Sequence, residues 1–218
     1  MKAQHSTRLF GMVLLLLATL LLSACGEQPR DRFDPLPADA VVLVIGDSLV
    51  TGTGASAGKD WPRHLAEATG WEVINAGVPG NTSADARRRL PELLDIHYPQ
   101  AVIIAIGGND FLRDVSPDET RANITAMIRR ARGVTEHVAL VAIPAKSMSG
   151  ALFGGLSDHG LYAELATENE LALIPNAVSE VLSDAALRSD RIHANDAGYA
   201  HIGQRVFDSL HEYGWFAP

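Results

Sequence analysis

Cysteine is nearly absent from this 218-residue chain, which contains only Cys25, so no internal disulfide can form. Aromatic residues make up only 6%, and without a dense aromatic stretch a polysaccharide-binding groove is disfavoured. No basic stripe accompanies the formal net charge of −8, which argues against nucleic acid as a partner. The histidines lack a metal-binding spacing such as H-E-x-x-H, so we expect neither a metal nor another cofactor. The length suits one well-buried domain and is short for two.

The first 24 residues have the pattern of a secretory signal peptide. Lys2 and Arg8 give it a positive start, and an almost unbroken apolar run at 9–22 is followed by two small residues. The run is too short, and ends too abruptly, for a comfortable membrane-spanning helix. We therefore expect residues 1–24 to be removed and the folded domain to occupy residues 40–218.

The segment Leu22-Ser23-Ala24-Cys25 resembles a bacterial lipobox, in which the cysteine is lipidated and becomes the new N-terminus. The alternative is an ordinary signal peptide whose cleavage site happens to contain a cysteine. Gly26, rather than aspartate, comes next, and in Gram-negative lipoproteins this favours sorting to the outer membrane. The next residues are rich in charge and proline, so we expect 25–39 to form a lipidated tether. The resemblance implies an exported lipoprotein that is anchored through Cys25 and faces the periplasm.

Apolar, β-branched runs alternate with segments that carry helix start and stop signals. The apolar runs predict strands at 41–45, 72–75, 101–106, 138–143 and 171–174. The other segments predict helices at 61–69, 83–94, 117–132 and 196–213, with one more helix after residue 160. This alternation indicates an α/β fold, a three-layer sandwich with a parallel five-stranded sheet and helices on both faces. In such sheets ligands bind outside the carboxyl ends of the strands.

The first predicted strand ends in Gly46-Asp47-Ser48-Leu49. A serine in this place lies on the ligand-binding rim, and the glycine allows a tight turn that exposes its hydroxyl. The same triplet also makes ordinary turns, so alone it is weak evidence for a nucleophile. Residue 50 is valine, which excludes the G-x-S-x-G elbow of the α/β-hydrolases.

Possible hydrogen-bond donors follow the next two strands. The backbone N–H of Gly77, after the second strand, could face an anion, or the glycine could simply form a turn. After the third strand, Gly107 and Gly108 allow close approach of the chain, and Asn109 could project its side-chain amide over the rim. The alternative for Asn109 is an Asx turn.

Asp190 and His193 form the remaining pair of candidate residues. Their spacing of three can place carboxylate and imidazole on the same side of a turn, where the carboxylate fixes the tautomer of the ring. A surface Asp–His pair without a function is the alternative. The other histidines beyond the signal segment lie where helix faces, helix ends or loops are expected.

In this order the motifs resemble those of the SGNH hydrolases, also called GDSL esterases. Gly46 to Leu49 match the first block of that family, Gly77 the second, 107–110 the third, and Asp190 with His193 the last. The resemblance implies a flavodoxin-like fold and a serine esterase with a catalytic triad of Ser48, His193 and Asp190. It further implies an oxyanion hole formed by the backbone N–H groups of Ser48 and Gly77 and the Asn109 amide, with no metal or cofactor.

The sequence is most similar to the periplasmic thioesterase I type of this family, which also acts as lysophospholipase, arylesterase and protease. The motifs that carry this similarity are Trp61-Pro62, Gly80-Asn81-Thr82-Ser83, Arg89-Leu90-Pro91 and Gly107 to Arg113. A proline usually follows the catalytic histidine in these enzymes, whereas this chain has Ala194. The similarity implies a small ester, thioester or lysophospholipid substrate.

Large apolar residues on the rim could line an acyl pocket. Phe111 and Leu112 follow Asn109, and the predicted loop 144–160 contains Met148, Leu152, Phe153 and Leu156. These loop residues could equally serve to pack the loop against the domain. Two other functions remain open: a carbohydrate O-deacetylase on the same fold, and a lipoprotein that kept the fold as a non-catalytic binding module.

Overall fold

The computed structural model describes residues 33–145 and 155–216. The predicted signal peptide, Cys25 and most of the predicted tether lie outside the described residues, as do Met148, Leu152 and Phe153 of the expected pocket loop. Within the described residues, no helix is both long and apolar enough to cross a membrane.

Five parallel strands form one sheet in the order β2-β1-β3-β4-β5. Their bounds are Val41–Gly46 (β1), Glu72–Gly77 (β2), Ala101–Ala105 (β3), His137–Val141 (β4) and Ala172–Ile174 (β5). The central strands are buried over almost their whole length, as expected for apolar runs covered by helices on both faces. The predicted parallel five-stranded sheet is therefore confirmed.

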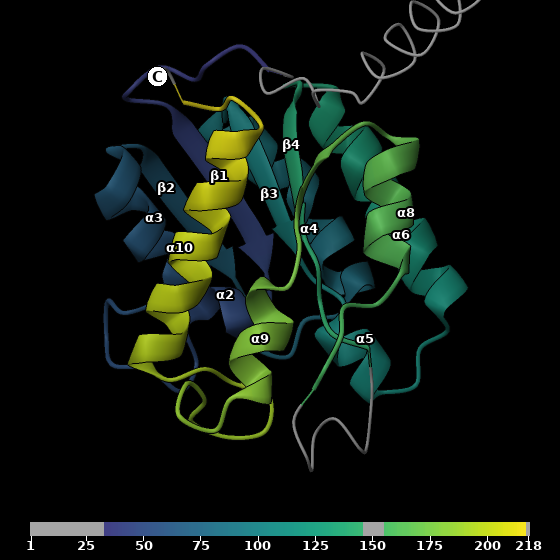
Figure 1. Ribbon diagram of the computed structural model, residues 1–218. Coiled ribbons are helices and arrows are strands. Elements are labelled where there is room, and N and C mark those ends of the chain that lie inside the picture. Colours follow the sequence, from purple (N-terminus) through teal and green to yellow (C-terminus); the bar gives the residue numbers. More distant parts are fainter. Residues whose placement is uncertain (1–32, 146–154, 217–218) are drawn as a thin grey trace, which may run out of the picture. The chain divides into compact units, whose positions relative to one another are not determined.

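Helices cover both faces of the sheet (Figure 1). One layer contains α3 (Trp61–Thr69), α9 (Ala177–Ser183) and α10 (Asp196–Glu212). The opposite layer contains α4 (Ser83–His97), α6 (Pro117–Arg132) and α8 (Leu161–Glu168). The three-layer sandwich is confirmed, and every predicted helix is present, although α4 continues three residues further than expected.

Side-chain caps explain where several helices begin. Asp60, Ser116 and Asn195 each accept a hydrogen bond from a backbone N–H in the first turn of the helix that follows. Thr82 forms a capping box with Asp85 at the start of α4. These contacts satisfy N–H groups that have no acceptor within their own helix, so the caps fix the helix starts.

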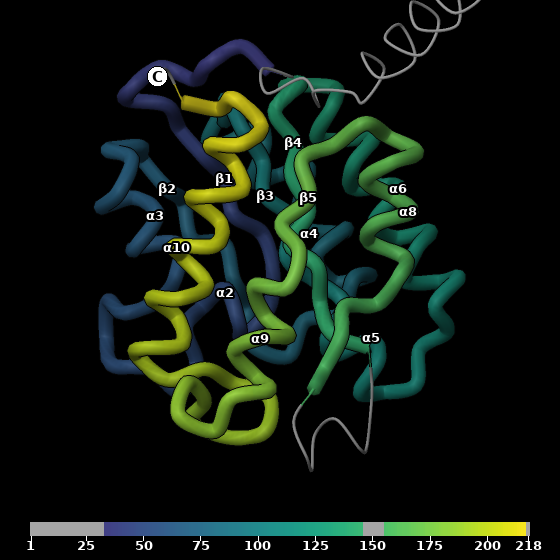
Figure 2. The backbone as a smooth tube through the Cα atoms, viewed as in Figure 1, coloured from purple at the N-terminus to yellow at the C-terminus, as the bar shows by residue number. Residues whose placement is uncertain are grey.

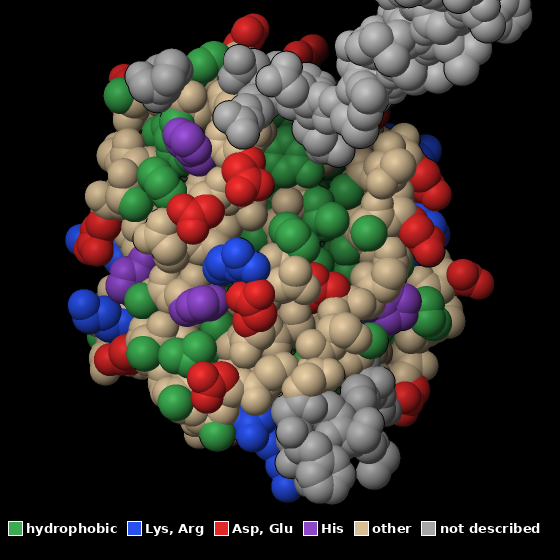
Figure 3. Space-filling model, in the orientation of Figure 1, with side chains coloured by type: hydrophobic (Ala, Val, Ile, Leu, Met, Phe, Trp, Pro, Cys, Tyr) green, Lys and Arg blue, Asp and Glu red, His purple; other side chains and the backbone are tan. Residues whose placement is uncertain are grey.

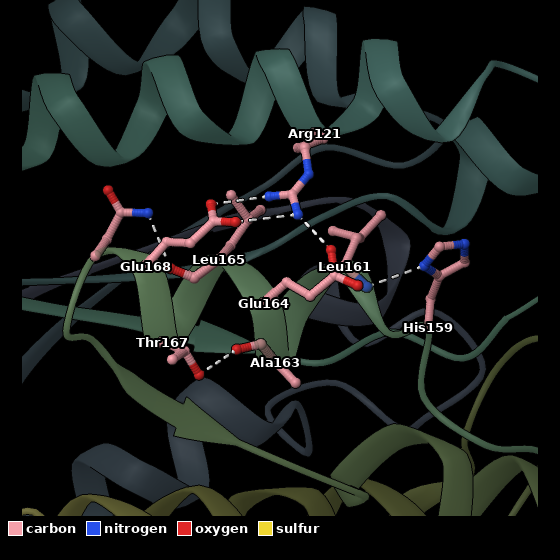
Figure 4. Close-up of polar contacts among 9 residues, drawn as sticks. Arg121, His159, Leu161, Ala163, Glu164, Leu165, Thr167 and Glu168 are labelled. Carbon is pink, nitrogen blue, oxygen red and sulfur yellow. Dashed lines mark hydrogen bonds and ion pairs between the residues drawn. The ribbon is translucent and has the colours of Figure 1, made fainter.

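Helix α8 is tied to its neighbours by both surface and buried contacts. On the surface, Arg121 of α6 pairs with Glu164 and with Glu168, the latter at 3.0 Å (Figure 4). Exposed ion pairs of this kind contribute at most about 1 kcal/mol. The buried Tyr162 hydroxyl donates to the backbone oxygen of Ile106 at 2.7 Å, just beyond β3. This bond holds α8 against the end of the sheet where the candidate residues lie.

Two short helices that the sequence did not predict lie at the carboxyl ends of the strands. Helix α2 (Ser48–Thr51) follows β1, and α5 (Gly108–Leu112) follows β3. Figure 2 shows that α2, α5 and the loop between α9 and α10 all lie toward the lower end of the domain. On the face in Figure 3, acidic and basic side chains are interspersed rather than segregated.

Candidate active site

Ser48, His193 and Asp190 form one chain of hydrogen bonds. His193 Nδ1 lies 2.7 Å from Asp190 Oδ2, and His193 Nε2 lies 3.0 Å from Ser48 Oγ. With Nδ1–H donating to the carboxylate, Nε2 is left to accept the proton of the serine hydroxyl. The fold therefore brings Ser48, from near the start of the domain's sequence, together with Asp190 and His193, from near its end.

The turn that carries Asp190 holds the carboxylate in place. Asp190 Oδ1 accepts hydrogen bonds from the backbone N–H groups of Ile192 and His193, both at 2.8 Å. Partial burial tends to raise the pKa of Asp190, but the hydrogen bonds from the His193 ring and from these backbone groups outweigh it and lower the pKa below its usual value. Asp190 is therefore ionised at neutral pH, and it orients the imidazole.

Ser48 occupies the first position of α2. Asp47 caps this helix by accepting a hydrogen bond from the Leu49 N–H at 3.0 Å. The Ser48 N–H has no acceptor within the helix because it belongs to the first turn. A free donor thus lies beside the serine hydroxyl, as expected for one part of an oxyanion hole.

Gly77 does not offer the free N–H group expected of it. Its N–H donates to Asn75 Oδ1 at 3.0 Å. A side chain here would come within 2.5 Å of the Thr51 nitrogen and 2.8 Å of the Asp47 oxygen, so the position requires glycine for close packing of β2 against α2. The predicted donor role of Gly77 is replaced by a packing role.

Gly80 is a donor candidate that the sequence reasoning missed. Residues 78–81 form a turn closed by the Asn81 N–H donating to the Val78 oxygen at 3.1 Å. Pro79 and then Gly80, with φ of 79°, fit the two central positions of a type II turn. The Gly80 N–H takes no part in closing the turn, and it has no acceptor among the described residues. The signal in the sequence was the Pro-Gly pair.

Asn109 projects its amide from α5, as predicted, but both N–H directions already have acceptors. Nδ2 lies 3.0 Å from the Asn81 backbone oxygen and 3.2 Å from Asp47 Oδ2. The first contact joins α5 to the Gly80 turn. The second is longer, and it is the one an oxyanion could share or replace. Asn109 therefore lies between the turn and the serine helix rather than in a simple Asx turn.

Asp110 anchors α5 from behind. It is completely buried, and it accepts hydrogen bonds from the Ser83 N–H at 2.8 Å, from the Ser83 hydroxyl and from the Thr120 hydroxyl at 3.3 Å. Asn123 donates in turn to the Ser83 hydroxyl at 3.0 Å. This network links α5 to α4 and α6, and it fixes the helix that carries Asn109.

Asp47 is the most strongly perturbed acid beside the serine. It is 2% exposed, and burial raises its pKa to about 6, although the Leu49 N–H, His193 and Asn109 each favour the charged form. A carboxyl group with a raised pKa beside a nucleophile is typical of functional sites. The sequence marked this residue only as part of the Gly-Asp-Ser triplet.

An apolar cavity of about 280 Å³ opens beside Ser48 and Asn109. Its lining includes Phe111, Leu112, Ile143, Leu156, Leu182 and Ile192. The volume is near the lower end of the range for small-molecule pockets, about 300–1,000 Å³. Phe111, Leu112 and Leu156 were candidates for the lining of an acyl pocket, and all three lie on this cavity.

The family model described as GDSL-like Lipase/Acylhydrolase matches residues 44–201. This chain is a GDSL-family hydrolase. The match begins within β1 and ends within α10, so it includes the end of β1, the other four strands and all the candidate residues of the site. The resemblance stated from the sequence motifs is thereby confirmed at the level of the family.

Named relatives of this GDSL hydrolase are esterases and thioesterases. It is 31% identical over 159 residues to thioesterase 1/protease 1/lysophospholipase L1 of Escherichia coli (strain K12), covering 71% of this chain and 75% of that protein. It is 30% identical over 179 residues to esterase TesA of Pseudomonas aeruginosa, covering 79% and 89%. An arylesterase of Vibrio mimicus is 29% identical over the same length.

Solved structures agree with the fold of this GDSL hydrolase. A crystal structure of TesA superposes with a TM-score of 0.69 and 27% identity, covering 78% of this chain and 97% of that one. The psychrotrophic esterase EstA from Pseudoalteromonas sp., inhibited by monoethylphosphonate, has a TM-score of 0.68 and 25% identity, with coverage of 79% and 97%.

Proposed function

We propose that this enzyme is a serine esterase that hydrolyses carboxylic esters or thioesters through an acyl-enzyme on Ser48. The hydrogen-bond chain from Asp190 through His193 to Ser48, with distances of 2.7 Å and 3.0 Å, carries the proposal. A free hydroxyl is a weak nucleophile, and a positioned base is what activates it. An intact triad also disfavours a non-catalytic binding module.

The mechanism follows from the positions of these groups. His193 takes the Ser48 proton while Ser48 Oγ attacks the carbonyl carbon, and Asp190 stabilises the resulting imidazolium. The imidazolium then protonates the departing alcohol or thiol, which leaves the acyl group on Ser48. Water, deprotonated by His193, attacks this ester and releases the acid and the free serine.

Three donors would stabilise the negative charge that develops on the carbonyl oxygen. We assign this role to the N–H groups of Ser48 and Gly80 and to the Asn109 amide, with Gly80 in place of Gly77. The free N–H of Gly80 and the 3.0 Å bond between Asn109 and the Gly80 turn support the assignment. One such donor typically contributes about 3–4 kcal/mol to transition-state stabilisation.

The apolar cavity is suited to the acyl part of the substrate. Beyond the catalytic groups and Arg191, its lining is mainly aliphatic and aromatic, and its volume of about 280 Å³ exceeds the needs of an acetyl group. We therefore favour esters with longer acyl chains, of the lysophospholipid, aryl ester or acyl thioester kind, over carbohydrate O-acetyl groups. The activities named for the relatives from Escherichia coli, Pseudomonas aeruginosa and Vibrio mimicus support this choice.

We further propose that the enzyme is exported and anchored through a lipid on Cys25, in the outer membrane and facing the periplasm. The lipobox-like segment 22–25 and the absence of any other cysteine support this proposal. Gly26 supports the outer membrane as the destination.

The function is tested by kinetics on aryl esters that differ only in acyl length. Activity should rise from acetyl to medium chains, and a fluorophosphonate probe should label wild type but not Ser48→Ala. A second test combines two substitutions in the triad. Ser48→Ala and His193→Ala should each lower kcat by several orders of magnitude.

The double variant should be no worse than either single one, because the two residues act in one mechanism. Activity confined to acetyl esters would favour the deacetylase, and a double variant far worse than both would refute the shared triad.

A further inference from the structure

Arg89 differs from the two arginines that precede it. Arg87 and Arg88 are exposed, and Arg88 pairs with Asp85 at the surface. Arg89 is partly buried, and its guanidinium contacts the carboxyl ends of β1 and β2. Nε donates to Asn81 Oδ1 at 2.9 Å, and Nη2 lies 3.1 Å from the Ala76 oxygen and 3.3 Å from the Gly46 oxygen.

All the hydrogen-bond acceptors of Arg89 are neutral. Among the described residues, it has no carboxylate within ion-pair distance. Burial lowers the pKa of Arg89, and the charge of Asp85 compensates in part, but an arginine stays charged in proteins. Partly burying a cation without a counter-charge costs stability, so packing alone gives no reason for an arginine here.

The three acceptors adjoin the three proposed oxyanion donors. The Gly46 oxygen terminates β1 two residues before Ser48. The Ala76 oxygen lies near the end of β2, which leads into the Gly80 turn. Asn81 belongs to that turn, and its backbone oxygen accepts the hydrogen bond from Asn109 Nδ2. The Arg89 guanidinium thus bonds to the carboxyl ends of β1 and β2. It also bonds to the Gly80 turn, which in turn contacts Asn109.

We propose that Arg89 is the positioning residue of the oxyanion hole, holding the Gly80 turn and, through Asn81, the Asn109 amide in register with Ser48. The proposal rests on the proposed esterase function. Arg89 does not touch the reacting atoms. It acts through Asn81 and the ends of β1 and β2, and its charge adds to the positive potential that favours an oxyanion.

Arg89→Met tests the proposal, and Arg88→Met on the same helix is its matched control. Methionine keeps an unbranched apolar stem and removes every donor. Because oxyanion contacts act mainly in the transition state, Arg89→Met should lower kcat about 10- to 100-fold and change KM less than about threefold. A trifluoromethyl ketone, which forms an oxyanion on the serine, should bind weaker by a similar factor. Arg88→Met should leave all three values unchanged.

Two further variants keep the test decisive if Arg89→Met folds poorly. Arg89→Lys keeps the charge but not the planar fork, so kcat should fall to an intermediate value. Asn81→Ala removes only the side-chain acceptor, and its effect on kcat should not add to that of Arg89→Lys. Folded Arg89 variants with wild-type kcat and inhibitor affinity, differing only in thermal midpoint, would overturn the proposal. Failure of the proposed function itself is distinguishable, since Ser48→Ala and Asn109→Ala would then remain active.

Discussion

The buried Asp47 carboxylate lowers the stability of the folded protein at neutral pH. Its pKa in the folded protein is raised to about 6 from an ordinary value of 3.8, mainly because burial penalises the carboxylate. Between these values the folded state binds more protons than the unfolded state. The free energy of unfolding therefore falls as pH rises through this window, by up to about 3 kcal/mol from this group.

Asp47→Asn removes this titration while keeping an oxygen that can accept from the Leu49 N–H. We expect the stability of the variant relative to wild type to increase between pH 4 and pH 7, by up to about 3 kcal/mol. Urea unfolding of both proteins across this range measures the difference. Parallel stability curves would mean that burial does not raise the pKa of Asp47. Because Asn109 loses its carboxylate partner, kcat should also change.

Asn109 distinguishes an oxyanion donor from a residue that only shapes a turn. If it is a donor, Asn109→Ala should lower kcat by about a hundredfold or more with little change in KM. Asn109→Asp should be at least as damaging, since a carboxylate lacks the donor and repels both the oxyanion and Asp47. Steady-state kinetics on an aryl ester, with a melting curve for each variant, provide the measurement. A well-folded Asn109→Asp with near wild-type kcat would contradict the assignment.

At the residue scale, the sequence predicted which residues belong to the site better than it predicted their hydrogen-bond partners. Ser48, His193 and Asp190 could be selected because their motifs follow strands or have a fixed spacing, and they lie within hydrogen-bond distance. Gly77 was named as the donor instead of Gly80. Both glycines follow the same predicted strand, so the sequence alone does not distinguish between them. Only the structure reveals that the Gly77 N–H is occupied by Asn75. Arg89 was noted only as part of the Arg89-Leu90-Pro91 motif, and its role could not be predicted because two of its three acceptors are backbone oxygens, which leave no pattern in a sequence.

Among the elements, α5 depends on a buried polar network rather than on its own length. It has five residues, too few for an independently stable helix. Asp110 anchors it through the hydroxyl groups of Ser83 and Thr120 and the Ser83 N–H. Removing that carboxylate would leave the buried N–H and hydroxyl of Ser83 without their acceptor, whereas the Thr120 hydroxyl could still donate to the Ser116 oxygen.

Asp110→Ala should therefore destabilise the protein by about 3 kcal/mol, because hydrogen bonds to buried charged groups are expensive to lose. It should also lower kcat, since the adjacent Asn109 loses its support. Asp118→Ala, an exposed acid in the first turn of α6, is the control and should cost less than about 1 kcal/mol. Urea unfolding and aryl ester kinetics measure both effects. An Asp110→Ala protein as stable as the control would argue against the network.

Element type was predictable, and the short connecting elements were not. Buried runs such as 101–105 are apolar enough to identify a strand with helices on both sides. Helix α4 was expected to end at residue 94, yet it continues to His97 and contains Pro91. Helices α2 and α5 were not predicted, because elements of four and five residues show no helical periodicity.

For the whole molecule, the N-terminal anchor is the main untested prediction. Cys25→Ser should move the protein from the membrane fraction to the soluble fraction, because a serine cannot carry the lipid. Fractionation with mass spectrometry of the N-terminus tests this, and Ser48→Ala, which should stay with the membrane, is the control. A soluble mature protein with an unmodified Cys25 would refute the anchor.

The described chain starts at the amino ends of the strands, opposite the active site. Phe33 packs against His137, the first residue of β4, with ring centroids 5.4 Å apart. The Asp34 oxygen bonds the ring of the same histidine at 2.7 Å. In Figure 1 this segment lies at the top, and α2 and α5 lie toward the bottom.

A lipid anchor at Cys25 would therefore be joined to the domain at the end of the sheet opposite Ser48. Seven residues separate Cys25 from Phe33, and a chain of that length reaches about 25 Å at most. Esters could then reach the cavity beside Ser48 without passing the point where the anchored segment joins the domain.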